Sequence, residues 1–227
     1  ASANHCYEEG TQEEVEKFYG EKKKENALLS WGLNSTLVRD ENEQLKEQVW
    51  FAGGKYGKEI HRIVEYLKKA AEYACNAHQK EVIELLIRYY ETGDLSLFDR
   101  YSIEWVKEVA APIDFINGFI EVYGDPLAYK ASWESVVQIM DEEACERKLA
   151  DNAMWFERNA PIDERFKKSE VVGITARVVQ AAMLGGDCHP ATPIGINLPN
   201  AEWIRERYGS KSVTLDNITY AYDRASL

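Results

Sequence analysis

The sequence predicts an α+β protein, and two features of the chain carry this prediction. Apolar side chains recur with helical spacing over residues 58–74, which indicates an amphipathic helix. Later in the chain, residues 113–123 and 193–199 are short, rich in β-branched side chains and bounded by turn-forming residues, as is typical of strands. We therefore expect helices first, and then short strands interrupted by a helical excursion.

Composition excludes several classes of protein. The 227 residues are 45% hydrophobic and 29% charged, so we expect a folded chain with one large domain or two small ones. The net charge of −12 argues against nucleic acid as a partner, and no apolar run approaches the ~20 residues of a membrane span. The scattered cysteines favour a reducing, cytoplasmic location. They are Cys6, Cys75, Cys145 and Cys188.

The N-terminal region contains signals for a helix and a strand. Thr11 and Glu14 have the spacing of a capping box, which predicts that a short helix begins here, and Gly20 is a candidate for its end. Residues 33–39 are expected to form a strand, and residues 40–42 its turn.

Three helices are predicted in succession after this turn. The first covers residues 58–74, the second runs over about residues 79–91 and ends at Gly93, and the third begins near Asp94 or Ser96. Because the connections are short, we expect the three helices to pack side by side.

Strand signals return after Pro112. Residues 113–123 are β-branched and aromatic and predict a strand with Gly118 at its centre. From about Ala131 to Asn159 the apolar spacing predicts a helix, which Pro161 ends.

The C-terminal region is predicted to be mainly strand. Residues 170–184 are compatible with a strand or a helix, and the pattern leaves both open. Residues 193–199 predict a short strand, residues 200–209 a helix closed by Gly209, and residues 212–222 one or two further strands.

No motif in the chain supplies a complete catalytic or metal-binding set. The histidines form no zinc-binding spacing, and the local cluster Asp187, Cys188 and His189 lacks a visible third or fourth ligand, so a polar loop is the favoured interpretation. The acidic run 141–148 is interpreted as a solvated helix face. Neither a nucleophile motif nor a phosphate-binding glycine loop is present.

Asp114 is the first candidate site residue. Its neighbours Ile113, Phe115 and Ile116 are apolar, and a buried carboxylate is costly unless it is paired. Two interpretations stay open: an acid on the solvent face of a half-buried strand, or an acid held ready for a cation such as a ligand ammonium. Glu121 is interpreted as structural.

The stretch 193–200 is the second candidate. Because Leu198 precedes Pro199, Gly195 through Leu198 is expected to form a strand that the proline ends, and a proline at this place suggests a sheet edge. An extended peptide can pair with such an edge, and glycine allows close backbone approach. Asn197 offers an amide to a docked chain, while Asn200 suits the N-cap of the following helix.

Three stretches, residues 53–79, 116–134 and 193–222, make the chain similar to the zinc-dependent dipeptidyl peptidase III family. The resemblance implies a fragment of a bacterial, two-lobed enzyme that releases dipeptides from the free N-terminus of short peptides. It further implies that helices surround a small β-barrel or mixed sheet in a substrate-binding lobe, made of residues 1–130 and 169–227. The excursion 131–168 would join the zinc-binding lobe.

The resemblance also implies roles for individual residues. Asp114 corresponds to the acid that binds the substrate ammonium, Gly195, Ile196 and Asn197 to the strand that pairs with the substrate, and Asn200 to a second substrate-binding amide. The family's zinc motifs, His-Glu-x-x-Gly-His and Glu-Glu-Cys-Arg-Ala-Glu, do not occur in this chain. We therefore expect the zinc ligands to lie outside it, in a longer protein, and the fragment to be inactive alone.

Two further points complete these expectations. Some family members have a tyrosine two residues after the acid, and here Ile116 stands in that place, so this role is not assigned. The alternative function is a non-catalytic module that binds peptides, or serves as a scaffold, through the edge strand at residues 193–198.

Overall fold

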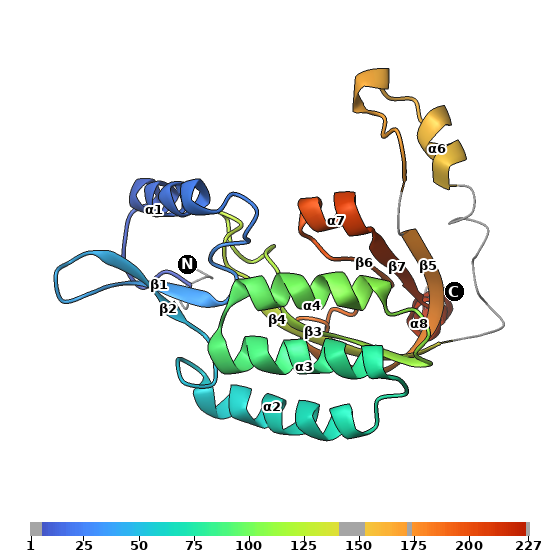
Figure 1. The fold of residues 1–227 in the computed structure, drawn as a ribbon, viewed down its shortest axis with the longest axis horizontal. Helices are drawn as coiled ribbons and strands as arrows, with labels where there is room; N and C mark the ends of the chain where they lie inside the picture. Colours follow the sequence, from blue (N-terminus) through green and yellow to red (C-terminus); the bar gives the residue numbers. More distant parts are fainter. Residues whose placement is uncertain (1–5, 141–152, 172–173, 226–227) are drawn as a thin grey trace. The chain divides into compact units, whose positions relative to one another are not determined.

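The computed structural model describes residues 6–140, 153–171 and 174–225 (Figure 1). These residues form both helices and strands, which confirms the α+β prediction. The acidic run 141–148 lies outside the described residues. No helix in the described part of the chain is long and apolar enough to cross a membrane.

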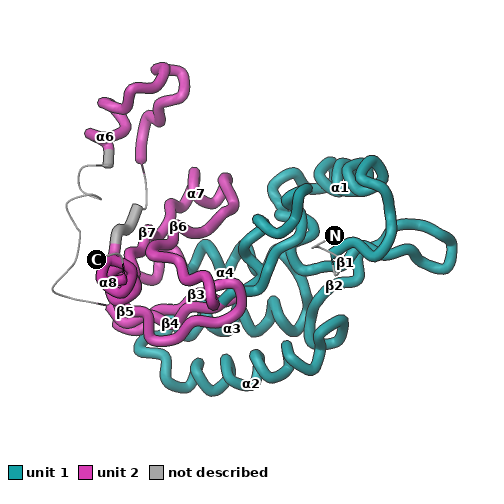
Figure 2. The backbone as a smooth tube through the Cα atoms, turned by 180° about the vertical axis from the view of Figure 1, so that it is seen from behind, with its two compact units in different colours: residues 1–105, 118–134 teal, residues 106–117, 135–227 magenta. Residues whose placement is uncertain are grey.

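The chain divides into two compact units (Figure 2). Unit 1 comprises residues 1–105 and 118–134, and unit 2 comprises residues 106–117 and 135–227. Unit 1 contains the N-terminal helices and a two-stranded sheet, and the candidate site residues, Asp114 and residues 195–200, belong to unit 2.

Helix α1, Gln12–Glu25, opens unit 1 and begins with the predicted capping box. Thr11 accepts a hydrogen bond from the Glu14 backbone N–H, and the Glu14 carboxylate accepts one from the Thr11 N–H. The predicted end at Gly20 is wrong, because the helix continues for five more residues. A helical glycine costs only about 1 kcal/mol, and the lysines at positions 22–24 favour the last turn through the helix dipole.

The two-stranded sheet of unit 1 is a hairpin. Strand β1, Ser35–Arg39, pairs antiparallel with β2, Leu45–Val49. In the turn between them the Asp40 side chain accepts hydrogen bonds from the backbone N–H groups of Asn42 (2.8 Å) and Gln44 (3.0 Å). This confirms the predicted strand and turn, while the polar sequence of β2 gave no strand signal.

The three predicted helices are present as α2 (Gly57–Glu72), α3 (Ala77–Thr92) and α4 (Leu95–Lys107) (Figure 1). Helix α2 packs on α3, and ring contacts between Tyr89 and Phe98 join α3 to α4. Prediction and structure therefore agree on these helices and on their packing.

Gly93 ends α3 as predicted, in the left-handed conformation with φ of +74°. A Cβ atom here would lie 2.5 Å from a methyl carbon of Val49. Both the backbone conformation and the close packing therefore require glycine at this position.

Strand β3, Ile113–Glu121, confirms the strand predicted after Pro112. Gly118 lies near its centre, and a Cβ atom there would lie 2.8 Å from the ring of Phe98 in α4. The glycine is thus explained by the close packing of an aromatic ring on the strand.

The helix predicted from Ala131 is wrong over its first part, because Ser132–Met140 forms strand β4. Burial alternates along this strand, with Glu134, Val136 and Gln138 all inward. The same apolar residues also fit a helical spacing, so the sequence pattern was ambiguous, and pairing within the sheet decides the outcome.

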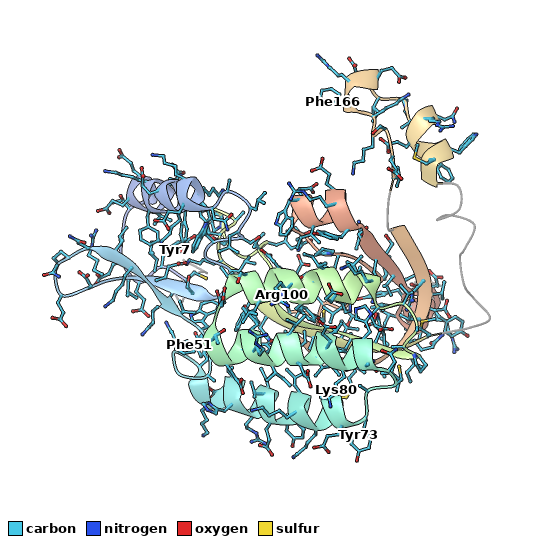
Figure 3. The ribbon with its side chains drawn as sticks, in the orientation of Figure 1. Tyr7, Phe51, Tyr73, Lys80, Arg100 and Phe166 are labelled. Atoms are coloured by element: carbon cyan, nitrogen blue, oxygen red, sulfur yellow. The ribbon has the colours of Figure 1, made fainter. Side chains whose placement is uncertain are left out.

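Within the described residues, the helical part of the excursion is α6 (Ala153–Asn159), followed by the 3₁₀ helix η1 (Glu164–Phe166). Helix α6 ends before Pro161, as expected. Large apolar side chains are exposed on this segment, including Trp155 and Phe166. Phe166 is labelled in Figure 3.

The main sheet has the strand order β3-β4-β5-β7-β6. Strand β5 (Ile174–Gly186) runs parallel to β7 (Ser210–Leu215), and β6 (Gly195–Leu198) runs antiparallel to β7. The sheet is therefore mixed, as one form of the prediction stated, and its described strands do not close into a barrel. Within the stretch 170–184, for which strand and helix were both open, the residues from Ile174 onward form strand β5.

Two helices follow in the C-terminal part of unit 2. Helix α7, Glu202–Tyr208, ends at Gly209 as predicted. Of the one or two strands predicted over residues 212–222, one is present as β7, and a second is absent because Asp216–Ala225 forms helix α8. The Asn217 side chain accepts a hydrogen bond from the Ala181 N–H and donates one to the Ala181 carbonyl, both at 2.9 Å. These bonds fix the helix on β5, a tertiary contact that local β propensity does not reveal.

Each unit has its own apolar core. In unit 1 the fully buried members of one cluster are Val15, Tyr19 and Leu37. In unit 2 they are Val179, Val213 and Leu215. The second cluster lies on β5 and β7, so the core of unit 2 directly supports the strand next to β6.

Unit 1 also buries a lysine. The Lys130 ammonium donates hydrogen bonds to the hydroxyl groups of Tyr19 and of Ser35, and these hydroxyls also donate to the Glu47 carboxylate. Burial lowers the pKa of Lys130 to about 8, although the Glu47 carboxylate opposes the shift. The ammonium form of this side chain is therefore destabilising in the folded state.

Removal of Lys130 is expected to change the pH dependence of stability. Between pH 8 and pH 10.5 the folded chain holds a neutral amine while the unfolded chain keeps the proton, so stability rises with pH. Relative to Lys130→Met, the free energy of unfolding of the wild type should increase by about 1–2 kcal/mol between pH 7.5 and pH 9.5. Urea titrations at several pH values measure this, and a constant difference would contradict it.

Candidate functional site

Strand β6 lies at an edge of the main sheet, where the sequence predicts an exposed strand. It begins at Gly195, ends at Leu198 directly before Pro199, and pairs with β7 alone among the described strands. The predicted strand, its end at the proline and its edge position are confirmed. Such an edge presents backbone groups with which another extended chain can pair.

The ladder between β6 and β7 fixes which backbone groups point outward. The Leu215 N–H donates to the Ile194 carbonyl at 2.9 Å, so these two residues form a hydrogen-bonded pair. Such pairs alternate along an antiparallel ladder. It follows that Ile196 directs its backbone groups toward β7, whereas those of Gly195 and Asn197 point toward the free edge.

The side chains of β6 are distributed over the two faces of the sheet. Ile196 packs on the core beside Val213, whereas Asn197 is exposed and its Oδ1 accepts a hydrogen bond from the Ser212 hydroxyl at 3.3 Å. A Cβ atom at Gly195 would lie 3.1 Å from the Val213 carbonyl oxygen of β7. Tight packing inside the sheet therefore already favours glycine here.

Asn200 is not the N-cap of the following helix, so this part of the prediction is wrong. Helix α7 begins at Glu202, and its N-cap is Ala201, whose carbonyl accepts the N–H groups of Ile204 and Arg205. Asn200 lies in the exposed connection between β6 and α7. Its position is compatible with a contact to a chain that extends beyond β6.

Asp114 is buried and already has a cationic partner. The residue is 3% exposed, and its Oδ2 lies 2.9 Å from the Nζ of Lys211, which is fully buried on β7. Oδ2 also accepts a long hydrogen bond from the Gln138 amide (3.4 Å), and Oδ1 accepts the Phe115 N–H (2.8 Å). Asp114 therefore does not point to solvent, and a lysine of the chain itself binds its carboxylate.

The charges around this ion pair balance. Burial lowers the pKa of Lys211, while the Asp114 carboxylate opposes that shift. Arg177 lowers the Lys211 pKa further, and Glu108 raises it. All four residues are less than a tenth exposed, and their formal charges sum to zero. Such a cluster is stable only while each charge keeps its counter-charge.

Lys211 connects Asp114 to the edge strand. It lies opposite Leu198 in the ladder, and both side chains are buried on the same face of the sheet. Asp114 in β3 and Lys211 in β7 are three strand positions apart, about 14 Å in a flat sheet. Their contact therefore indicates that the sheet curls, which brings the carboxylate to the inner face near the end of β6.

The structure thus brings together only some of the predicted site residues. Asp114 and Ile196 face inward, whereas the Asn197 side chain faces outward. Ile116 is buried and supplies no hydroxyl group.

Sequence reasoning missed Lys211, Gln138 and Arg177. One signal for Lys211 was available, because it alternates with Val213 and Leu215 and so occupies an inward position of β7.

Metal-ligating side chains do not gather in the described part of the chain. No group of three or more histidine, cysteine, aspartate or glutamate residues there is arranged to hold a metal ion. At the candidate cluster, the His189 N–H closes a turn on the Gly186 carbonyl (3.1 Å), and Cys188 is buried and not in a disulfide. The described residues therefore do not fit a zinc site, and no chemical step is assigned to a metal in this chain.

Comparison with known proteins identifies similar sequences. A family model described as Peptidase family M49 matches residues 17–226. The chain is 30% identical over 173 residues to dipeptidyl peptidase 3 of Dictyostelium discoideum, which covers 74% of this chain and 24% of that protein. It is 27% identical over 179 residues to dipeptidyl peptidase 3 of Homo sapiens, and this match covers 77% of this chain and 24% of that protein. The chain spans about a quarter of the length of these curated relatives.

A solved structure is also similar. The structure of DPP III from Caldithrix abyssi matches with a TM-score of 0.79 and 28% sequence identity. This match covers 97% of the present chain and 42% of the other. The fold found here is therefore also present within a longer chain.

Proposed function

Since this chain belongs to peptidase family M49, we propose that it forms the substrate-binding part of a zinc-dependent dipeptidyl peptidase. This is the family that the sequence of residues 53–79, 116–134 and 193–222 resembles. The proposed enzyme releases dipeptides from the free N-terminus of short peptides. This activity belongs to the full-length protein, with zinc held by residues outside this chain, and the chain alone is inactive.

The observation that carries the proposal is the open edge of β6. Gly195 and Asn197 direct backbone N–H and C=O groups away from β7, so an extended peptide can add to the sheet as a further strand. Ile196 supports this edge from the core, and Asn200 lies where a docked chain would continue. Backbone pairing is independent of side-chain identity, which suits an enzyme that acts on many short peptides.

Asp114 sets the length of the released product in this proposal. Its carboxylate binds the substrate ammonium, and the second peptide bond then lies about 7 Å further on, at about 3.3 Å per residue in an extended chain. Support comes from the position of the carboxylate on the inner face near the end of β6. For this role Lys211 has to give up the carboxylate.

We further propose that residues 1–130 and 169–227 form the substrate-binding lobe and that residues 131–168 join the zinc-binding lobe. The exposed aromatic side chains of the 153–171 segment, Trp155, Phe156 and Phe166, support such a contact. The free thiols Cys6, Cys75 and Cys188 accord with a cytoplasmic location.

The edge-strand proposal is tested by Asn197→Pro in the full-length protein. Proline removes an N–H that points to the free edge and leaves the ladder with β7 intact, which edge strands tolerate. We expect kcat/KM for release of dialanine from tetraalanine, measured by mass spectrometry, to fall about tenfold or more.

Asn197→Ala is the matched control, because it keeps the backbone N–H and removes the side-chain amide. It should lose less activity than the proline variant, and thermal melting should show both variants folded. Equal activity of Asn197→Pro and the wild type would contradict peptide pairing at β6. Absence of any dipeptide product from the wild type would contradict the peptidase assignment itself.

A further inference from the structure

The Asp114 carboxylate is bound by an ammonium group that belongs to the chain. Lys211 is fully buried, and its Nζ lies 2.9 Å from Oδ2. A peptide N-terminus carries the same functional group, a primary ammonium with three N–H donors. The internal contact therefore has the chemistry that the proposed function requires of the substrate contact.

Charge balance prevents the two ammonium groups from sharing this site. Asp114, Glu108, Lys211 and Arg177 already sum to zero in a region from which water is largely excluded. A third cation would add one uncompensated buried charge, which costs several kcal/mol in effective desolvation. A substrate ammonium therefore enters only if one positive charge leaves.

The Gln138 side chain offers an acceptor to a further hydrogen-bond donor at this site. Its Nε2 donates to the Asp114 carboxylate, but its Oε1 is buried and has no hydrogen-bond partner in the structure. The residue is 0% exposed, and leaving such an acceptor unsatisfied is costly. An ammonium group that approaches Asp114 would supply the missing donor.

We propose that Asp114 and Gln138 form an ammonium-exchange site, in which Lys211 is the resident ammonium and the N-terminal ammonium of a peptide replaces it. This inference rests on the proposed function and assigns to it two residues, Lys211 and Gln138. The peptide ammonium binds the Asp114 carboxylate and donates a further hydrogen bond to Gln138 Oε1.

The exchange conserves charge. The peptide keeps its proton and pairs with Asp114, while Lys211 releases one proton to solvent and remains inside as a neutral amine. Burial and Arg177 both lower the Lys211 pKa. Two carboxylates raise it, and Asp114 does so more than Glu108. Loss of the Asp114 contact therefore favours the neutral amine.

Calorimetry on the full-length protein tests the exchange. The probe is a tetraalanine analogue whose second peptide bond is replaced by an uncleavable hydroxyethylene group, with a free or an N-acetylated amino terminus. Titrations at pH 7 in two buffers of different ionisation enthalpy give the number of protons released. We expect about one proton per free-amino peptide and none for the acetylated peptide, which should bind about a hundredfold more weakly.

Two variants sharpen the test. Gln138→Met should weaken the free-amino peptide about tenfold and leave the acetylated peptide unchanged. Asp114→Asn should abolish the preference for the free amino group. If the free-amino peptide binds more tightly but releases no proton, the exchange is overturned and the proposed function stands. If both peptides bind the wild type equally, ammonium recognition by Asp114 is overturned as well.

Discussion

Replacing Asp114 by alanine is expected to lower the free energy of unfolding of the chain by about 3–5 kcal/mol. The variant leaves the fully buried Lys211 without its closest counter-charge, so the folded state must hold an uncompensated ammonium or give up its proton, and both are unfavourable. An uncompensated buried charge costs more than the lost hydrogen bond alone. Urea titration followed by circular dichroism measures the loss.

The double variant Asp114→Ala/Lys211→Met separates the ion pair from other effects of the substitution. An apolar pair of similar volume often replaces a buried ion pair at little cost, so the double variant should be more stable than Asp114→Ala. The losses of unfolding free energy in Asp114→Ala and in Lys211→Met should together exceed the loss in the double variant by at least about 1 kcal/mol. Additive losses would mean that the 2.9 Å contact contributes nothing to stability.

Replacing Asp125 by alanine is the second large effect expected, about 3–4 kcal/mol of unfolding free energy. This buried carboxylate organises the turn between β3 and β4. It accepts hydrogen bonds from the Tyr7 hydroxyl (2.6 Å) and from the backbone N–H groups of Leu127, Tyr129 and Lys130 (2.8–3.0 Å). Its removal leaves several buried donors without an acceptor, and urea titration again measures the result.

Two controls accompany Asp125→Ala. Asp125→Asn keeps one acceptor oxygen and should lose less stability than the alanine variant. Asp163→Ala removes an exposed aspartate that accepts a backbone hydrogen bond from Arg165, and it should change stability by less than about 1 kcal/mol. A similar loss at Asp125 and Asp163 would show that the buried turn contributes no special stability.

Local signals predicted the helices of unit 1 well. The capping box at Thr11 and the left-handed Gly93 act within one turn of the chain, so the sequence contains the whole interaction. The strand at Gly195–Leu198 was also predictable, because Pro199 restricts the preceding residue and ends the strand.

The predicted secondary structure was wrong where contacts with residues distant in the sequence decide between helix and strand. Residues 132–140 satisfy both a helical and a strand spacing, and pairing in the sheet selects the strand. Residues 216–225 have strand propensity, and the hydrogen bonds of Asn217 to Ala181 favour the helix. In both cases non-local contacts exceed a local preference worth about 1 kcal/mol or less.

The sequence by itself determined the family, the edge strand and the presence of an acid among apolar neighbours. Only the tertiary structure decided what binds that acid, because Lys211 lies 97 residues from Asp114 along the chain. The tertiary structure also decided which backbone groups of β6 point outward, since this depends on the register with β7. Periodicity shows which face of an element is buried, but the pairing of charges and strands depends on contacts between distant segments.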